Sequence, residues 1–521
     1  MGTTHREIEL KLELTPGTAE ALAGLGVPEG FGRGKARTQR LRSIYFDTPD
    51  TALARARIAA RVRLKGKTWI QTVKLPGDPA GSGLHTPREY EVKVPSAEFS
   101  LDAVPDEDVR AEIAAALGGQ SLAPRFETVI ERSQRDITAP DGSLVEVALD
   151  IGEIVAGPRR QPLQELELEL KSGQIEGLYA IARALVGPLP FRFSALSKAE
   201  RGDRLARGED GVPAAHPALA EPVDLSSGLT AERAYHAILR SCSHQIAENR
   251  MACLAGDDPE GPHQLRVGLR RLRTALRLFR PLVNPRSTGA LDAAAQRLAL
   301  GIGRLRDLDV LSADIVAPLL AIAPERVDLA RLDRHLDGLR AQRRQDVQAL
   351  LVSQTVNDLL FDLASYTETR GWLSSEDIEQ SERLAVPVAE FARSALDGQW
   401  RRVQKYGNRL DSLTIAERHD MRKALKKFRY GLEFFAGLTP KGERKSYLKR
   451  LKSLQDVFGY LNDVAMAEML LDLPLPDGTA ATDLAQAAGF VIGWHEAEAR
   501  HAWQHAQDSW DEASRAPKYW R

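Results

Sequence analysis

Near its start the chain alternates charged and apolar residues strictly. Residues 7–14 read EIELKLEL, with three glutamates and a lysine at the odd positions and aliphatic residues at the even ones. Side chains of a strand point alternately to its two faces, so this pattern predicts a strand with one charged and one apolar face. Residues 165–171, ELELELK, repeat it. A solvated strand face would look the same, but two such strands favour a shared polar interior.

Between these two segments the pattern predicts further short strands, with most acids and bases on one face of each. A sandwich would need one buried apolar face, so the pattern favours a barrel with a polar lumen and helices on its outside. The alternative is an antiparallel sheet with exposed charged faces. The strands are expected at 40–46, 60–65, 69–74, 89–94, 126–137, 143–150 and 165–170, and helices at 106–117 and 175–186.

A polar interior of this composition suggests its ligands. Closely spaced carboxylates repel one another unless a cation lies among them, and hard divalent cations such as Mg²⁺ take oxygen ligands. The lysines would then bind an anion. The pattern therefore indicates a metal and phosphate site.

Beyond residue 202 the pattern changes. Residues 203–224 contain several prolines and glycines and no periodicity, which predicts a linker. Apolar residues then recur with the helical period. Helical segments are expected at 230–254, 262–281, 288–322, 328–368, 379–407, 414–436, 445–472 and 481–512.

The segment 263–280 has a purely basic stripe beside a leucine stripe. The stripe contains His263, Arg266, Arg270, Arg273, Arg277 and Arg280. Solvated helix faces usually mix charges, and like charges at i,i+4 cost about 0.2–0.5 kcal/mol per pair, so we expect a bound polyanion. Each histidine could instead be an ordinary residue near a helix start. A metal role is disfavoured, because no second His or Cys lies at ligand spacing.

The same stripe recurs 156 residues later, which indicates an internal duplication. Counterparts at this offset include His419, Arg422, Lys426 and Arg429, and the offset also relates Gly303 and Asp307 to Gly459 and Asp463. The copies differ where Glu433 replaces Arg277. We expect two pseudo-symmetric helical bundles that bring the two stripes together. Because of the difference at Glu433, we expect the two stripes to bind the polyanion unequally.

Composition sets the remaining bounds. The 521 residues carry a net charge of −1, with 43% hydrophobic and 27% charged residues, so anion binding must come from local charge segregation. Two cysteines exclude a disulfide framework. No apolar run of about 18 residues and no signal-like start is seen. The cytoplasm is the expected location, without membrane association.

The first half resembles the CYTH domain, or triphosphate tunnel metalloenzyme, over residues 5–202. The resemblance rests on the ExExK signature of residues 7–11 and on an ordered series of motifs ending in Ser197–Gly202. It implies an eight-stranded antiparallel β tunnel that binds triphosphates with a divalent metal, Mg²⁺ or Mn²⁺. Implied catalytic residues are Glu7, Glu9 and Lys11; implied metal ligands are Glu7, Glu9, Glu165 and Glu167, with Glu169 also open; implied phosphate contacts are Lys11, Arg61, Arg63, Lys74, Arg132 and Lys198.

The second half resembles the CHAD domain, an all-helical domain associated with inorganic polyphosphate, over about 225–515. The family implies anion contacts at His263, Arg266, Arg270, Arg273, His419, Arg422, Lys426 and Arg429. The expected fold class is thus an α+β tunnel domain (1–202), a linker (203–224) and an all-α domain (225–515).

Three functions remain open from the sequence. The first is a metal-dependent hydrolase of inorganic triphosphate, with polyphosphate bound by the helical half. The second is a class IV-type adenylate cyclase using the same tunnel, and the third is a non-catalytic polyphosphate scaffold, which the intact Glu7, Glu9 and Lys11 set disfavours. Nucleic acid is disfavoured too, because the basic stripe lacks aromatics that stack on bases.

Overall fold

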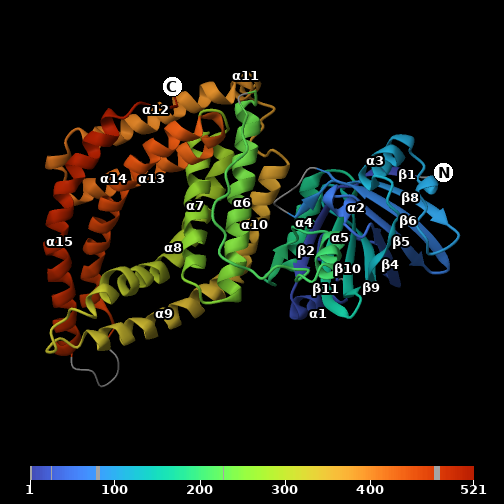
Figure 1. Cartoon of the computed structure of the whole chain (residues 1–521), viewed down its shortest axis with the longest axis horizontal. Helices are drawn as coiled ribbons and strands as arrows, with labels where there is room; N and C mark the ends of the chain where they lie inside the picture. The colour runs from blue at the N-terminus through green and yellow to red at the C-terminus, as the bar shows by residue number, and fades with distance from the viewer. Residues whose placement is uncertain (1–2, 25, 78–82, 227, 475–480, 521) are drawn as a thin grey trace. The chain divides into compact units, whose positions relative to one another are not determined.

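The computed structural model describes residues 3–24, 26–77, 83–226, 228–474 and 481–520 (Figure 1). Contacts divide the chain into two compact units: residues 1–215 with 352–369, and residues 216–351 with 370–521. Each unit is described by itself below.

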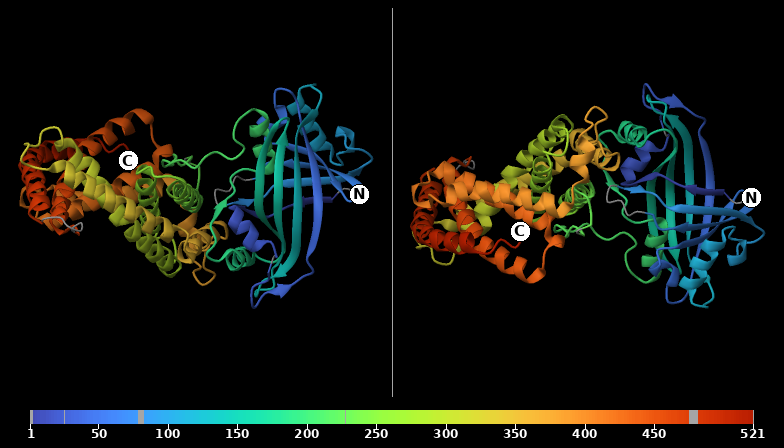
Figure 2. Two further views of the ribbon diagram at one scale, coloured as in Figure 1. Left: turned by 90° about the horizontal axis from the view of Figure 1, so that it is seen from below. Right: turned by 90° about the horizontal axis from the view of Figure 1, so that it is seen from above.

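The first unit is built on one antiparallel sheet, which Figure 2 shows as a curled set of long strands. Its eight strands of six residues or more are β2 (Glu9–Leu14), β4 (Arg37–Asp47), β5 (Ala59–Lys65), β6 (Thr68–Leu75), β8 (Arg88–Val94), β9 (Ala123–Thr138), β10 (Leu144–Ala156) and β11 (Arg159–Ser172). The short strands are β1 (Thr3–Arg6), β3 (Gly32–Arg33), β7 (Leu84–His85) and β12 (Phe191–Phe193). The strand order is β1-β8-β6-β5-β4-β9-β10-β11-β2-β12.

The sheet curls until its two ends meet near the start of β2. β7 pairs with β2, and the Glu7 amide donates to the Pro87 carbonyl at 3.2 Å, just before β8 begins. The curled antiparallel sheet confirms the predicted tunnel fold.

The apolar faces of the two alternating segments form the outer core of this sheet. Leu10, Leu12, Leu166 and Leu168 have no exposed surface, and α1 (Pro16–Leu22) and α4 (Ile175–Val186) pack against the β10–β11 side. Burying each leucine contributes about 1.5–3 kcal/mol. On the β5–β6–β8 side, α3 (Glu107–Leu117) covers a second apolar cluster. These outer cores leave the charged faces turned inward.

One helix closes against the inner side of the sheet. α5 (Lys198–Ala206) begins with a capping box, in which Ser197 and Glu200 bond each other's backbone amides. It packs on β9, β10 and β11 at Gly202, where a Cβ would lie 2.0 Å from the Phe126 ring. Glycine is therefore required for α5 to approach so closely, and this approach places Lys198 inside the sheet.

The second unit contains only helices and loops among its described residues. These helices are α6 (Ala231–Ala255), α7 (Glu260–Leu278), α8 (Pro285–Val310), α9 (Leu329–Leu351), α11 (Gln380–Ala385), α12 (Val388–Gly407), α13 (Ile415–Phe434), α14 (Lys441–Ala467) and α15 (Ala481–Arg515). The duplicated segments are the helix pairs α7–α8 and α13–α14, and α7 contacts α13. The predicted all-helical second half is confirmed.

Two expected helices are each broken in the structure. The segment 328–368 divides into α9 and α10 (Gln354–Glu368) at Ser353, whose backbone is extended. The segment 379–407 divides at Pro387, because proline lacks the amide that a helix interior needs and pushes the preceding residue to extended backbone. Each of these two predicted helical segments therefore contains two helices.

The predicted domain boundaries also differ in detail from the contact division. α5 continues to Ala206, inside the predicted linker, and Val223 near the linker's end is buried in the second unit. α10 packs with the first unit: Phe361 stacks on Phe191 with ring centroids 4.8 Å apart, and Asn357 donates to the Gly187 carbonyl at 2.8 Å. The first unit therefore includes a helix from the second half of the sequence.

Candidate active site and anion-binding stripes

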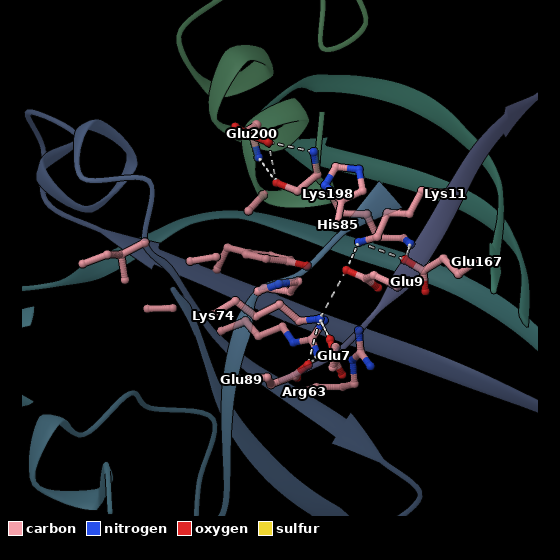
Figure 3. Close-up of a pocket in the computed structure, with 18 of the residues that line it drawn as sticks. Glu7, Glu9, Lys11, Arg63, Lys74, His85, Glu89, Glu167, Lys198 and Glu200 are labelled. Atoms are coloured by element: carbon pink, nitrogen blue, oxygen red, sulfur yellow. Dashed lines mark hydrogen bonds and ion pairs between the residues drawn. The ribbon is translucent and has the colours of Figure 1, made fainter. Parts of the chain in front are cut away.

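The curled sheet encloses a cavity of about 800 Å³. Most of the predicted tunnel residues line it, and Figure 3 shows their side chains converging from several strands and α5. The predicted residues that line the cavity are Glu7, Glu9, Lys11, Arg61, Arg63, Lys74, Arg132, Glu167, Glu169 and Lys198. The fold thus brings together residues separated by up to 191 positions in the sequence.

The centre of the cavity is formed by the pairing of β2 with β11. Register sets Lys11 opposite Glu167 and Glu9 opposite Glu169. The Lys11 ammonium lies 2.9 Å from Glu9 and 3.5 Å from Glu167. These carboxylates raise the pKa of Lys11 well above its ordinary value, against the lowering effect of burial. Lys11 is therefore a permanent cation in the cavity wall.

A second cluster surrounds Lys74. Its ammonium lies 2.7 Å from Glu7, 2.8 Å from Glu89 and 3.9 Å from Glu9 (Figure 3). Burial, followed by the hydrogen bond to Glu89, raises the pKa of Glu7 to about 8. Glu89 keeps its charge, because Lys74 holds the pKa of its carboxyl well below the usual range despite burial. The Lys74 ammonium therefore occupies the position, among three carboxyl groups, in which a metal cation would be expected.

A third cluster surrounds Lys198, at the start of α5. Its ammonium lies 2.9 Å from Asp150, 2.6 Å from Glu165 and 2.7 Å from Glu167. Asp150 and Glu165 have no exposed surface. Arg132 reaches Asp150 with two hydrogen bonds of 2.7 and 2.6 Å. Burial of this many charges is tolerated only because they are paired.

Glu165 differs in position from the metal ligand that the resemblance implied. Its carboxylate lies beneath Lys198 and Arg201, at 2.6 and 3.3 Å, and it is not part of the cavity lining. Burial and the nearby Glu167 raise the pKa of its carboxyl against the effect of Lys198. Its position assigns Glu165 to the anchoring of α5.

Arg63 has a different environment from the other predicted cations. Within the described chain it has no carboxylate within ion-pair distance, and its Nε donates to the Ser43 hydroxyl at 2.9 Å. Burial, followed by Arg61 and Arg132, lowers the pKa of its guanidinium to about 10. Arg61 is 3.3 Å from Glu89, but its buried Nε has no hydrogen-bond partner in the described chain. These arginines retain unused donors for an anion.

The carboxylates of the cavity have the right chemistry for a hard divalent cation, but they are arranged around ammonium groups. Glu7, Glu9 and Glu89 offer only oxygen donors, which Mg²⁺ and Mn²⁺ prefer, and Lys74 now lies among them. Among the described residues no group of three acidic, histidine or cysteine side chains converges on a common point. These residues fit a metal if Lys74 moves away.

Among the cavity residues absent from the predicted site are Glu89, Tyr45 and His85. Glu89 lies on the charged face of β8. The alternation of charged and apolar residues along this strand could therefore have indicated that its side chain faces the cavity. Tyr45 stacks on Phe126 at 4.6 Å and shares a cross-strand row with Arg61; nothing in its apolar surroundings predicted an inward position. His85 donates from Nε2 to the Ser194 carbonyl at 3.0 Å, and burial lowers its pKa. His85 lies on the two-residue strand β7, and the pairing of this strand with β2, which orients the side chain, was not predicted from the sequence.

In the second unit the predicted stripes lie on α7 and α13, except that Arg280 follows the end of α7. Counterpart residues make counterpart contacts: Arg266 lies 3.5 Å from Asp307, and Arg422 lies 3.9 Å from Asp463. His419 Nδ1 is 3.0 Å from the Asn462 side-chain oxygen. Burial, then Arg306, lowers the pKa of His263. The structure therefore repeats the stripe geometry as the duplication predicted.

The fold and cavity define a tunnel-type antiparallel β protein joined to an all-helical unit. Family models confirm both parts: the CYTH domain matches residues 5–202 and the CHAD domain matches residues 237–472. The chain therefore consists of a CYTH domain followed by a CHAD domain.

Three relatives illustrate the similarity. An inorganic triphosphatase of Haemophilus influenzae is 31% identical over 205 residues, which cover 38% of this chain and only 54% of that protein. An uncharacterized protein of Mycobacterium tuberculosis is 25% identical over 436 residues, 77% of this chain and 75% of its own. The crystal structure of the CHAD domain from the plant Ricinus communis matches with 29% identity and a TM-score of 0.50, covering 58% of this chain and 98% of that one.

Within the described ranges, no helix is long and apolar enough to cross a bilayer.

Proposed function

We propose that the first unit hydrolyses inorganic triphosphate with the help of a divalent metal. The observation that carries the proposal is the cluster of Arg61, Arg63 and Arg132 on the cavity wall, in which Arg63 has no acid partner among the described residues. Buried cations with unused donors favour a ligand with several negative charges. The triphosphatase relative from Haemophilus influenzae supports this substrate class.

The proposed roles follow from the contacts. Arg63 and Arg61 bind phosphate oxygens without first giving up all their protein partners, and Lys74 and Lys198 exchange carboxylates for phosphate. Lys11 stays with Glu9 and orients that carboxylate. Water attacks the terminal phosphorus, the bridging P–O bond breaks, and the products are orthophosphate and pyrophosphate. A Mg²⁺ or Mn²⁺ ion held by Glu7, Glu9 and a carboxylate of β11 would neutralise phosphate charge and position the water.

The test compares two arginines on neighbouring strands. Arg63→Met removes a cavity cation, whereas Arg42→Met removes an outward arginine paired with Glu127 at 2.7 Å and half exposed. A charge-assisted hydrogen bond contributes about 1.5–3 kcal/mol, so Arg63→Met should raise the KM for triphosphate about tenfold or more. Arg42→Met should leave it within about twofold. Equal kinetics in both variants would contradict the assignment.

The second unit is proposed to bind inorganic polyphosphate. The supporting observation is the duplicated set of cations on the contacting helices α7 and α13, in a chain whose net charge is only −1. Such binding should weaken steeply with salt, by analogy with the counterion release of nucleic acids. Isothermal titration calorimetry with long-chain polyphosphate at two salt concentrations tests it.

A further inference from the structure

The helix α10 belongs to the helical half by sequence, since the CHAD match at 237–472 includes it, yet its contacts place it in the first unit. One face of the helix makes these contacts. Asn357 donates from Nδ2 to the carbonyls of Gly187 and Leu189 at 2.8 and 3.0 Å, just after α4 ends. Phe361 follows Asn357 by about one helical turn. α10 therefore holds the segment that runs from α4 into β12.

Phe361 completes a cluster of three buried aromatic rings at β12. Its ring stacks on Phe191 with centroids 4.8 Å apart and meets Phe193 edge-on at 5.8 Å. Phe191 and Phe193 also meet edge-on, with centroids 5.2 Å apart. All three side chains are buried, and aromatic pairs of this kind stabilise beyond the area that they bury. The cluster therefore fixes both ends of the three-residue strand β12.

The strand β12 in turn supports Lys11 in the cavity wall. Phe193 pairs with Leu12 of β2, and the next amide, that of Ser194, donates to the Lys11 carbonyl at 2.9 Å. The Lys11 amide donates to the Gly83 carbonyl at 2.9 Å. A Cβ at Gly83 would lie 2.9 Å from the Phe193 ring, so this ring packs directly on the glycine. The backbone of Lys11 is therefore held by two segments that both contact Phe193.

The same contacts orient the side chains around Glu9. The Nε2 of His85 donates to the Ser194 carbonyl at 3.0 Å, and His85 pairs with Glu9 across β7 and β2. The Lys11 ammonium lies 2.9 Å from Glu9. Figure 3 shows Glu9, Lys11 and His85 close together at the cavity. A continuous series of contacts thus leads from the α10 aromatic ring to a carboxylate that is proposed to hold the metal.

We infer that Phe361 is a positioning residue of the tunnel, which sets β12 and thereby the orientation of Lys11 and Glu9. The inference rests on the proposed function, in which Lys11 orients Glu9, and adds to it a residue from the helical half of the sequence. Arg61 and Arg63, the proposed phosphate contacts, lie on β5, which pairs with neither β2 nor β12. The metal side of the tunnel therefore depends on α10, and the phosphate side does not.

This division predicts which constant a change at Phe361 affects. Phe361→Leu keeps a buried apolar side chain but removes the ring that stacks on β12. Changing a residue that supports a metal ligand weakens metal binding by about 10–100-fold, and Phe361 acts through β12, so we expect the low end. The half-saturating Mn²⁺ concentration for triphosphate hydrolysis should rise about tenfold. The KM for triphosphate should stay within about twofold, because the arginines of β5 keep their positions.

The split between these two constants separates positioning from a loss of folded protein. A smaller folded fraction lowers the rate but changes neither the half-saturating Mn²⁺ concentration nor the KM. The matched control is Leu363→Val. Leu363 is also fully buried on α10, but it lies about 200° around the helix from Phe361. The control should therefore change the half-saturating Mn²⁺ concentration less than about twofold.

Hydrogen–deuterium exchange of the full chain gives a readout that needs neither metal nor turnover. The amides of Lys11 and Ser194 are hydrogen-bonded beside β12, so peptides that cover β2 and β12 report on its position. Phe361→Leu should raise their exchange rate about three- to tenfold, the range that the loss of an aromatic contact gives. Peptides that cover β5 should be unchanged. Leu363→Val should leave both sets of peptides near their wild-type rates.

Equal exchange of β2 and β12 in Phe361→Leu and in the control would overturn the inference, whatever the activity. An unchanged half-saturating Mn²⁺ concentration in Phe361→Leu would overturn it as well. A wild-type chain that does not hydrolyse triphosphate with Mn²⁺ would overturn the proposed function instead, and the exchange rates then still decide whether Phe361 positions β12. Circular dichroism checks folding, and Phe361→Met, which conserves the side-chain volume more closely, replaces Phe361→Leu if the latter is unfolded.

Discussion

The buried ion cluster around Lys198 gives a quantitative test of the tunnel architecture. Lys198→Met keeps the volume of the side chain and removes the ammonium that lies within 2.9 Å of Asp150, Glu165 and Glu167. Asp150 keeps Arg132, but Glu165 keeps only Arg201 at 3.3 Å. The variant therefore leaves a fully buried carboxylate poorly compensated.

The expected cost follows from this geometry. Removing one partner of a buried ion pair costs about 3–5 kcal/mol, and the remaining arginines place Lys198→Met at the low end, about 3 kcal/mol. Lys171→Met is the matched control: Lys171 lies 2.6 Å from Glu169, as close as the Lys198–Glu165 contact, but the side chains are 37% and 27% exposed. Exposed pairs contribute about 0.2–1 kcal/mol.

Hydrogen–deuterium exchange of peptides from β10 and β11 measures the difference locally. A loss of about 3 kcal/mol raises the exchange rate of protected amides about a hundredfold, whereas the control should raise it less than about sixfold. Similar exchange rates in both variants would refute the conclusion that the charged groups around Lys198, at the start of α5, are buried and depend on one another for stability.

Three further outcomes are expected. Gly202→Ala should destabilise the first unit by about 1–3 kcal/mol in calorimetry, because its Cβ would lie 2.0 Å from the Phe126 ring; Gly338→Ala, which meets nothing within 4 Å, should not destabilise. Lys74→Met should tighten Mn²⁺ binding in the absence of phosphate about tenfold, measured by electron paramagnetic resonance, because it frees carboxylates now 2.7 and 2.8 Å from an ammonium; unchanged binding would contradict this. Affinity for long-chain polyphosphate should fall by up to about tenfold from pH 6 to pH 8, because Lys426 has a pKa of about 7 when free and a bound anion raises it; Lys426→Met should abolish the dependence, and a rise with pH would oppose it.

Much of the fold follows from short-range patterns in the sequence. The alternation of residues 7–14 and 165–171 indicated which face of each strand is charged, and register then sets Lys11 opposite Glu167. Helix positions also followed from periodicity, as for α4, whose predicted bounds agree closely with the structure. These predictions succeed because the spacing of apolar residues along the sequence directly determines which side chains of a strand or helix are buried.

The remainder depends on contacts that no local pattern encodes. Glu165 and Glu167 lie on the same face of β11, yet α5 covers one and leaves the other in the cavity, because Gly202 lets the helix approach. Likewise Arg270 and Arg273 look equivalent in the stripe. Only the placement of Asp292 on α8 makes one of them an internal ion-pair partner.

The central claim is tested most directly by the products formed in the tunnel. Phosphorus-31 NMR follows the full chain with Mg²⁺ or Mn²⁺ on inorganic triphosphate and on ATP in parallel, with Glu9→Gln as the inactive control. The account predicts equal amounts of orthophosphate and pyrophosphate from triphosphate, no cyclic AMP from ATP, and no turnover in the variant. Efficient formation of cyclic AMP, or triphosphate hydrolysis that persists in Glu9→Gln, would contradict it.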